Sequence, residues 1–128
     1  MKHLATIALS TICLGATLAA NGRAQEVLWL DTLDLTNVQQ DFGRARANRS
    51  VDDKPISIAG KTFERGIGTH ARSEFAVDLK GVATRFDAAV GVDDEIGSQG
   101  SVVFIVMLDG KRIAESPRMV GGGSPHPL

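Results

Sequence analysis

Three consecutive acidic residues, Asp93, Asp94 and Glu95, form the densest group of side chains in the sequence that could carry chemistry. Hydrolysis of a glycosidic bond needs two carboxyl groups about 5 to 10 Å apart, one of them protonated. Adjacent residues of a regular strand point to opposite faces, so Asp93 and Asp94 would not face each other as such a pair. Their oxygens suit local turn hydrogen bonds, or alternatively a calcium ion or a sugar hydroxyl. We therefore expect no hydrolytic centre at this position.

A histidine, His70, lies in the stretch Gly66-Ile67-Gly68-Thr69-His70-Ala71. The two glycines permit a tight backbone and the close approach of another strand. The other histidines, His3 and His126, fall near the two ends of the chain, so no second histidine stands at metal-binding spacing. His70 is thus either a hydrogen-bonded packing residue or a direct ligand contact. The sequence has no Gly-x-Ser-x-Gly nucleophile turn.

Aromatic side chains are scarce, with one Trp, no Tyr and five Phe. Sugar-binding sites usually combine an aromatic face with a few fixed polar groups. Trp29 could stack on a sugar, or it could pack within a first strand around residues 27–30. Arg72 could donate two hydrogen bonds to sugar hydroxyls, or it could be a solvated surface residue. His70, Arg72 and Trp29 are the candidate sugar-binding residues.

The first 24 residues have the pattern of an export signal, because Lys2 precedes an apolar run that ends in small residues. Cleavage after Ala24, or alternatively after Ala19, would release a secreted or periplasmic protein. A retained membrane anchor is the other interpretation, since the run approaches the length of a bilayer span. After cleavage we expect no membrane association. The only cysteine, Cys13, would leave with the signal, so the mature chain could form no disulfide.

The remaining residues, from 25 onward, are enough for one small domain. The formal net charge is −1. Arg44, Arg46 and Arg49 are too few to indicate a nucleic-acid surface, so we expect no nucleic-acid partner.

Hydrophobic residues alternate with a period of two, which predicts an all-β domain. Residues 74–79 and 86–92 read as antiparallel neighbours, and 102–108 as a central strand covered on both faces. Ala59-Gly60 and Asp109-Gly110 predict two hairpin turns. Residues 38–47 read as a loop with at most one helical turn.

Several motifs, in this order, resemble the NPCBM module, which is carbohydrate-binding family 51, also described as the glycosyl hydrolase family 98 type of module. They are Ser57 to Phe63, Gly66 to Ala71, Arg85 to Ala88, Val90 to Glu95, Gly100 to Phe104 and Asp109 to Lys111. The resemblance runs from about Val27 to Ser116. It implies a galactose-binding-like β-sandwich, a jelly roll, and it makes a structural calcium ion plausible without naming its ligands; Asp93, Asp94 and Glu95 are the candidate ligands.

The C-terminus departs from the family pattern, in which further strands follow the one near Ile113. We expect an incomplete module over residues 25–116 with its final strands missing and a Gly/Pro-rich tail over 117–128; a linker tail on a complete short domain is the alternative.

By its resemblance, the chain is expected to be a secreted, non-catalytic module that binds galactose-type or related glycans beside a glycoside hydrolase catalytic domain in the same protein. The N-terminal part of a glycoside hydrolase, such as an alpha-galactosidase, is the second interpretation. A structural or adhesion domain without sugar binding is the third.

Overall fold

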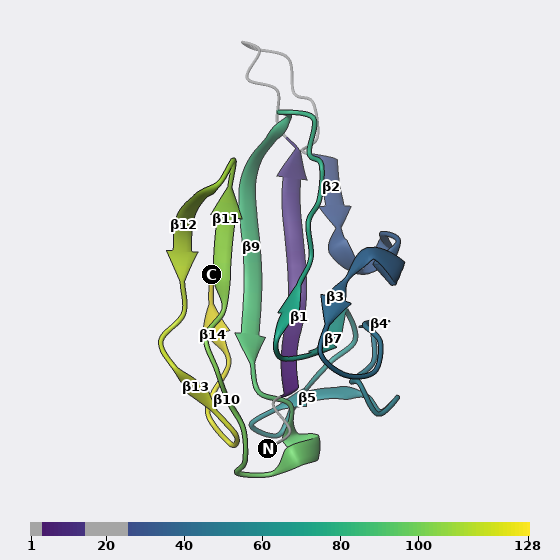
Figure 1. The fold of residues 1–128 in the computed structure, drawn as a ribbon, viewed down its shortest axis with the longest axis vertical. Helices are drawn as coiled ribbons and strands as arrows, with labels where there is room; N and C mark the ends of the chain where they lie inside the picture. The colour runs from purple at the N-terminus through teal and green to yellow at the C-terminus, as the bar shows by residue number, and fades with distance from the viewer. Residues whose placement is uncertain (1–3, 15–25) are drawn as a thin grey trace.

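The computed structural model describes residues 4–14 and 26–128, and these residues form an all-β fold without a closed barrel (Figure 1). The fold is of the β-sandwich kind, as the sequence predicted. The strands are β1 (Leu4–Leu14), β2 (Glu26–Trp29), β3 (Gln39–Gln40), β4 (Arg46–Ala47), β5 (Ile56–Ile58), β6 (Lys61–Phe63), β7 (Gly66–His70), β8 (Ser73–Glu74), β9 (Ala83–Gly91), β10 (Ser101–Val102), β11 (Ile105–Leu108), β12 (Lys111–Glu115), β13 (Met119–Val120) and β14 (His126–Pro127). Short 3-10 helices follow β2 and β9: η1 (Leu30–Thr32), η2 (Leu35–Asn37) and η3 (Asp94–Ile96).

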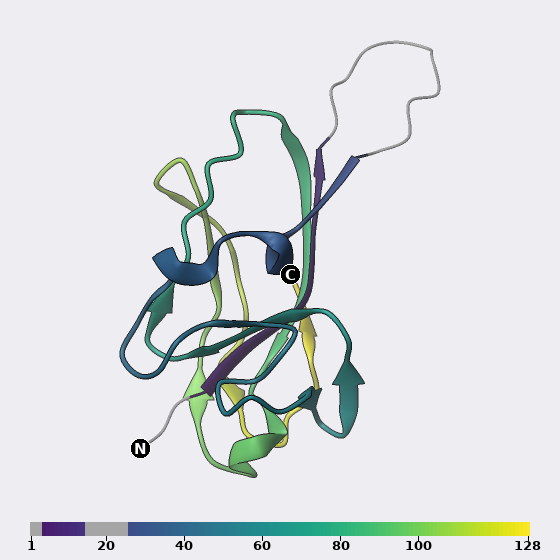
Figure 2. The same cartoon turned by 90° about the vertical axis from the view of Figure 1, so that its right-hand side faces the viewer.

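The main sheet has the strand order β14-β9-β1-β7-β4, with β2 paired to the remaining part of β1. β1 is antiparallel to all three of its partners: Leu4 to Ala8 pair with β7, Thr11 to Leu14 pair with β2, and Thr6 to Leu14 pair with β9. Figure 2 shows β1 and β9 running together along the length of the molecule. β1 is therefore the strand that joins the two halves of the sheet.

The predicted export signal overlaps this strand, since β1 occupies residues 4–14. The preferred cleavage point after Ala24, and the alternative after Ala19, lie outside the described residues. Removal of the leader would take β1 with it and leave the backbone edges of β7 and β9 without their shared partner. No helix of the described residues is long and apolar enough to cross a membrane.

The apolar core has two main parts, and Phe86 of β9 packs against both. One part joins Ala88, Val90 and Val92 of the β9 segment to Val102, Phe104 and Met119. The other surrounds Leu30 and Ile67, with half-buried side chains from the segment 75–83 packed against it. A smaller cluster under the β5–β6 hairpin contains Ile56, Ile58 and Phe63.

Both predicted hairpins are confirmed, because β5 pairs with β6 and β11 pairs with β12. Ala59 and Gly60 have positive φ angles, as do Asp109 and Gly110, which is the backbone of a tight two-residue hairpin turn. The residues of segment 38–47 are mostly loop, framed by the short strands β3 and β4.

Two strand predictions were wrong. Residues 75–79 keep an alternating burial pattern but pair with no strand, and β9 pairs with β1 and β14 instead. The apolar run 102–108 is divided between β10 and β11, and Met107 and Leu108 are 54% and 49% exposed. A continuous apolar run therefore did not mean a strand covered on both faces, because its outer part forms an exposed hairpin with β12.

The C-terminal residues also differ from the expected tail over 117–128. β13 pairs with β10, and β14 pairs with β9. Leu128 exchanges two backbone hydrogen bonds with Ala88, at 2.8 and 3.0 Å. Met119 is 6% exposed and belongs to the core. These residues are consequently part of the folded domain rather than a linker.

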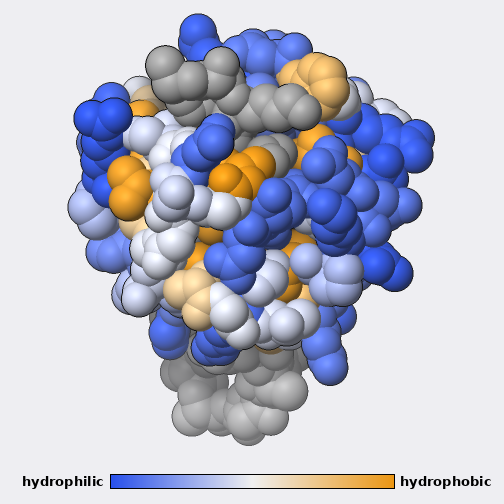
Figure 3. All heavy atoms as spheres, turned by 90° about the horizontal axis from the view of Figure 1, so that it is seen from below, coloured by the Kyte–Doolittle hydropathy of each residue, from blue (hydrophilic) through white to orange (hydrophobic). Residues whose placement is uncertain are grey.

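The end of the molecule that carries β5 and η3 is largely hydrophilic. Figure 3 looks at this end from below and shows mostly polar described residues with small apolar areas between them. An extended apolar surface is absent from the visible described part of this face.

Candidate functional site

Strand β7 contains the Gly66 to His70 motif, and all five of its residues are buried. β7 pairs with β1 on one side and with β4 on the other, where Arg46 lies opposite Gly68. The backbone of Arg49 and Ser50 passes directly over Gly68. The motif is therefore first a packing device that brings the loop after β4 close to the sheet.

His70 ends this strand and is 8% exposed. Its ring lies against Phe42, with 5.4 Å between the ring centroids and an interplanar angle of 60°. Its Nδ1 atom is buried and has no hydrogen-bond partner among the described residues. His70 thus supports Phe42 from the interior of the domain.

Phe42 is 57% exposed, unlike the core-facing phenylalanines. An exposed ring held from behind by a second ring is a suitable surface for the C–H face of a sugar. The sequence did not single out Phe42, because it lies in a polar loop without periodicity. Its position between Asp41 and Gly43, outside any apolar alternation, was the available signal.

Next to Phe42 in the chain, a cavity of about 280 Å³ is lined by residues of the paired strands β3 and β8 and by Asp41 and Arg72 beside them. The Arg72 amide donates to Asp41 Oδ2 at 3.2 Å, and the Asp41 amide donates to the Arg72 carbonyl at 3.1 Å. Every residue of the lining is polar: Gln39, Gln40, Asp41, Arg72, Ser73 and Glu74. Such a lining offers donors and acceptors in the mixture that sugar hydroxyls require.

Trp29 lies elsewhere and lines neither this cavity nor the larger one described below. It is half-buried, and the Arg65 guanidinium carbon lies 4.3 Å from its ring centroid. Arg65 is held in turn by Asp31, with 2.9 Å between Nη2 and Oδ2. The structure therefore brings His70 and Arg72 to one region and places Trp29 under an arginine outside it.

The acidic residues 93–95 bind neighbouring backbone and side-chain groups. Asp93 is 2% exposed and accepts hydrogen bonds from the amides of Ser57, at 3.2 Å, and Glu95, at 3.0 Å. Asp94 accepts from the amides of Ala59 and Gly60, both at 2.8 Å, and from the Ser57 hydroxyl. These contacts fix the β5–β6 turn to η3.

The pKa values of Asp94 and Glu95 are shifted in opposite directions. Burial raises the pKa of Asp94, but the hydrogen bonds from Ser57, Gly60 and Ala59 together outweigh it and leave that pKa below its usual value. Burial also raises the pKa of Glu95, and here the Ser50 hydroxyl bond does not compensate, so this pKa lies above its usual value. Glu95 Oε1 is buried and has no partner among the described residues.

As a set, these carboxylates do not fit a calcium site, because amide and hydroxyl donors occupy most of their oxygens. The described residues contain no group of three or more His, Cys, Asp or Glu side chains able to hold a metal ion. Calcium binding stays a prediction from the resemblance, without assigned ligands.

Comparison with known proteins identifies the family. The family model of the NPCBM/NEW2 domain matches residues 26–128. The chain belongs to this family. NPCBM/NEW2 domains bind carbohydrate and occur in proteins related to glycosidases.

Two curated relatives of this NPCBM/NEW2 domain are named as glycoside hydrolases. One is the "Putative endo-alpha-N-acetylgalactosaminidase" of Renibacterium salmoninarum, 34% identical over 77 residues, which are 60% of this chain and 5% of that protein. The other is alpha-1,3-galactosidase B of Akkermansia muciniphila, 37% identical over 75 residues, which are 57% of this chain and 9% of that protein. The match thus spans less than a tenth of either relative.

Proposed function

We propose that this NPCBM/NEW2 domain is a non-catalytic module that binds galactose-type glycans through Phe42 and the polar cavity lined by residues of β3 and β8. The family match over residues 26–128 carries the proposal. The names of the two relatives, which refer to galactose and N-acetylgalactosamine linkages, support this class of sugar. In related proteins such a module accompanies a hydrolase domain, which would place the bound glycan near the catalytic centre.

In the proposed site, Phe42 packs on the C–H face of the sugar and Arg72 donates to its hydroxyls. His70 positions Phe42 from behind. Asp41 and Glu74, which also line the cavity, have carboxylates that would accept hydrogen bonds from sugar hydroxyls. In a small open site the favourable interaction free energy exceeds the free-energy cost of association only slightly. We therefore expect dissociation constants of about tens of micromolar to millimolar.

The non-catalytic assignment rests on the acidic residues 93–95. Asp93 and Asp94 bind the backbone of the β5–β6 hairpin, so they form no acid and nucleophile pair facing an open cavity. The second candidate function is that of one part of a longer glycoside hydrolase, and the small share of each relative covered by the match favours it. In that case too, this domain would supply binding and another domain the chemistry.

We further propose that the protein is exported to the periplasm or the medium. The apolar N-terminal run supports this, with Gln25 as the first mature residue. Mass spectrometry of the secreted protein tests it, and a soluble extracellular form that retains Met1 would contradict it.

A glycan array followed by calorimetry with the purified full chain tests sugar binding. Phe42→Ala should abolish binding without unfolding the domain, whereas Ile113→Ala, at a residue 56% exposed on β12, should not change it. Release of nitrophenol from a nitrophenyl galactoside, lost in Asp94→Asn, would overturn the non-catalytic assignment.

A further inference from the structure

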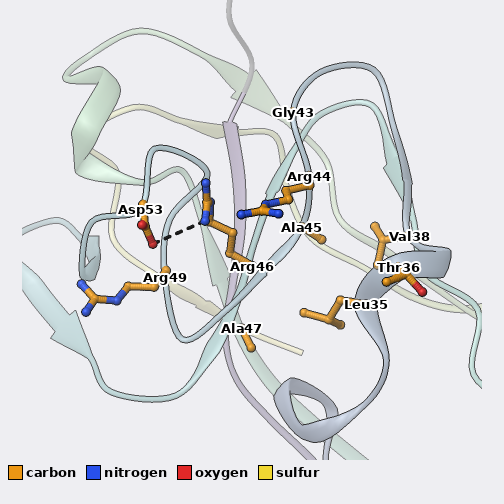
Figure 4. A pocket seen from close by; sticks show the side chains of 10 residues that line it. All are labelled: Leu35, Thr36, Val38, Gly43, Arg44, Ala45, Arg46, Ala47, Arg49 and Asp53. Carbon is orange, nitrogen blue, oxygen red and sulfur yellow. Dashed lines mark ion pairs between the residues drawn. The ribbon is translucent and has the colours of Figure 1, made fainter.

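A second, larger cavity of about 510 Å³ lies beside the loop that carries Phe42 (Figure 4). Its volume is within the range of small-ligand sites. Val38 and Gly43 of its lining flank Gln39 to Asp41, which line the polar cavity, so one loop borders both. Its lining combines apolar and charged residues: Leu35, Thr36, Val38, Gly43, Arg44, Ala45, Arg46, Ala47, Arg49 and Asp53.

Arg46 is held in a fixed orientation in this cavity. It lies on β4, and its Nε donates to the Val51 carbonyl at 3.0 Å. Its Nη1 lies 3.5 Å from Asp53 Oδ1, and its side chain is only 26% exposed. A guanidinium held at Nε and at one Nη keeps its other nitrogen free for a ligand.

Arg44 lines the same cavity as Arg46. Figure 4 shows its guanidinium extending toward Arg46, whose own guanidinium is turned to Asp53, while Arg49 points away from both. Among the described residues, no carboxylate forms an ion pair with Arg44. The only acid of the lining is Asp53. Its side chain is 63% exposed and forms an ion pair with Arg46. Two arginines on one cavity, with a single largely solvated acid that pairs with Arg46 only, create a positive potential that favours a bound anion.

We propose that the Arg44–Arg46 pair is an anion subsite that takes the acidic group of a charged glycan, either a carboxylate or a sulfate ester. This rests on the proposed function, because it assumes that the ligand is a glycan. Guanidinium groups bind both acids through paired, charge-assisted hydrogen bonds. The proposed subsite and the proposed neutral-sugar site at Phe42 lie on the same loop, which borders both cavities.

The apolar wall of the cavity favours a sugar as the carrier of the acid. Leu35, Val38 and Ala45 can contact the C–H groups of a pyranose ring, which an inorganic anion does not offer. A nucleic acid would require a longer track of positive charge, and the formal net charge of the chain is −1.

Calorimetry on the full chain tests the proposal with three galactose-based trisaccharides: one neutral, one with uronate carboxylates and one with sulfate esters. At low salt, at least one acidic ligand should bind about tenfold more tightly than the neutral one. The difference should shrink as salt is added. The two acidic arms distinguish a carboxylate from a sulfate, and a preference in either arm supports the subsite.

Arg44→Gln should bring the acidic ligands to the neutral affinity and leave neutral binding unchanged. Arg44 is exposed and outside the polar cavity, so its replacement should not affect folding, which a thermal transition can verify. Arg112→Gln, an exposed arginine of the β11–β12 hairpin, is the matched control and should keep the preference.

Neutral binding without any acidic preference, or a preference that survives Arg44→Gln, would overturn the subsite alone. A chain that binds none of the three ligands would refute the proposed function, and the subsite with it.

Discussion

Gly68 lies directly beneath the carbonyl oxygen of Arg49: a Cβ atom at position 68 would be 2.2 Å from that oxygen. The same atom would lie 2.8 Å from the Cα of Ser50. Both obstacles are backbone, which cannot rotate away as a flexible side chain could. The loop after β4, and the arginine-lined cavity that it borders, therefore depend on the absence of a side chain in the middle of β7.

Gly68→Ala should destabilise the domain by about 3 kcal/mol or more, at the upper end of the cost of overpacking. Denaturant unfolding of the full chain measures it. Gly81→Ala is the control, since no atom lies within 4 Å of its added Cβ, and its φ of 68° alone should cost about 1 kcal/mol. If both variants lost the same free energy of unfolding, the Arg49 carbonyl would have to be able to move aside.

Features that depend on local sequence were predictable. The two hairpin turns follow from Gly60 and Gly110, which adopt positive φ without steric cost, and the packing role of Gly68 follows from its lack of a Cβ. The predicted strand at residues 74–79 is wrong because the alternation of Phe75, Val77 and Leu79 reflects only that these side chains pack against the core. Such a pattern does not require a hydrogen-bonded partner strand.

The features that the sequence did not indicate depend on tertiary contacts. Phe42 is part of the proposed site because its exposed ring is packed from behind by His70, which is distant in the chain. Asp93 and Asp94 were candidate calcium ligands by composition, but which donors reach them depends on how the β5–β6 hairpin folds against η3. The assignment of Trp29 likewise depended on Arg65, which covers its ring.

Asp94→Asn should lower stability at neutral pH by about 1 kcal/mol, because it weakens hydrogen bonds to a carboxylate that is partly screened by solvent. The new amide group would face the Gly60 amide or the Ala59 amide, donor against donor. Because the pKa of Asp94 is lowered on folding, its contribution is present above the usual value of 3.8 and is lost as the pH falls through the lower folded value. Urea unfolding of both proteins should therefore converge in acid. A constant difference at all pH values would contradict this assignment.

Glu95→Gln should have the opposite effect. The folded pKa of Glu95 is raised, so its ionised form costs stability as the pH rises above the usual value of 4.5. The variant keeps an oxygen for the Ser50 hydroxyl and removes the charge near Asp93 and Asp52. It should gain stability relative to the parent chain between about pH 4 and 7. Glu115→Gln, at an exposed residue of β12, is the control, and a loss of stability in Glu95→Gln at neutral pH would show that the carboxylate is stabilising.

Arg72→Ala should weaken binding of a neutral galactoside by about tenfold, the loss of one or two hydrogen bonds to hydroxyls. The backbone of Arg72, not its side chain, makes the hydrogen bonds with Asp41, so folding should be retained. Parallel titrations with Arg112→Ala control for the removal of a positive charge. Loss of the thermal transition in Arg72→Ala would instead identify a structural role.

Removal of residues 1–24 should strongly destabilise the domain, because β1 provides the shared hydrogen-bonding partner of β7 and β9. The 25–128 fragment would expose two backbone edges beside an apolar core, and it should self-associate at micromolar concentration. A synthetic peptide of residues 4–14 should restore a cooperative, monomeric transition, whereas a scrambled peptide of the same composition should not. Light scattering and thermal unfolding measure both effects.

If the protein is exported with cleavage after Ala24, the same argument requires another strand to occupy the position between β7 and β9 in the mature protein. A monomeric fragment that unfolds cooperatively above about 60 °C, the upper part of the mesophile range, would show that the domain closes this position without β1.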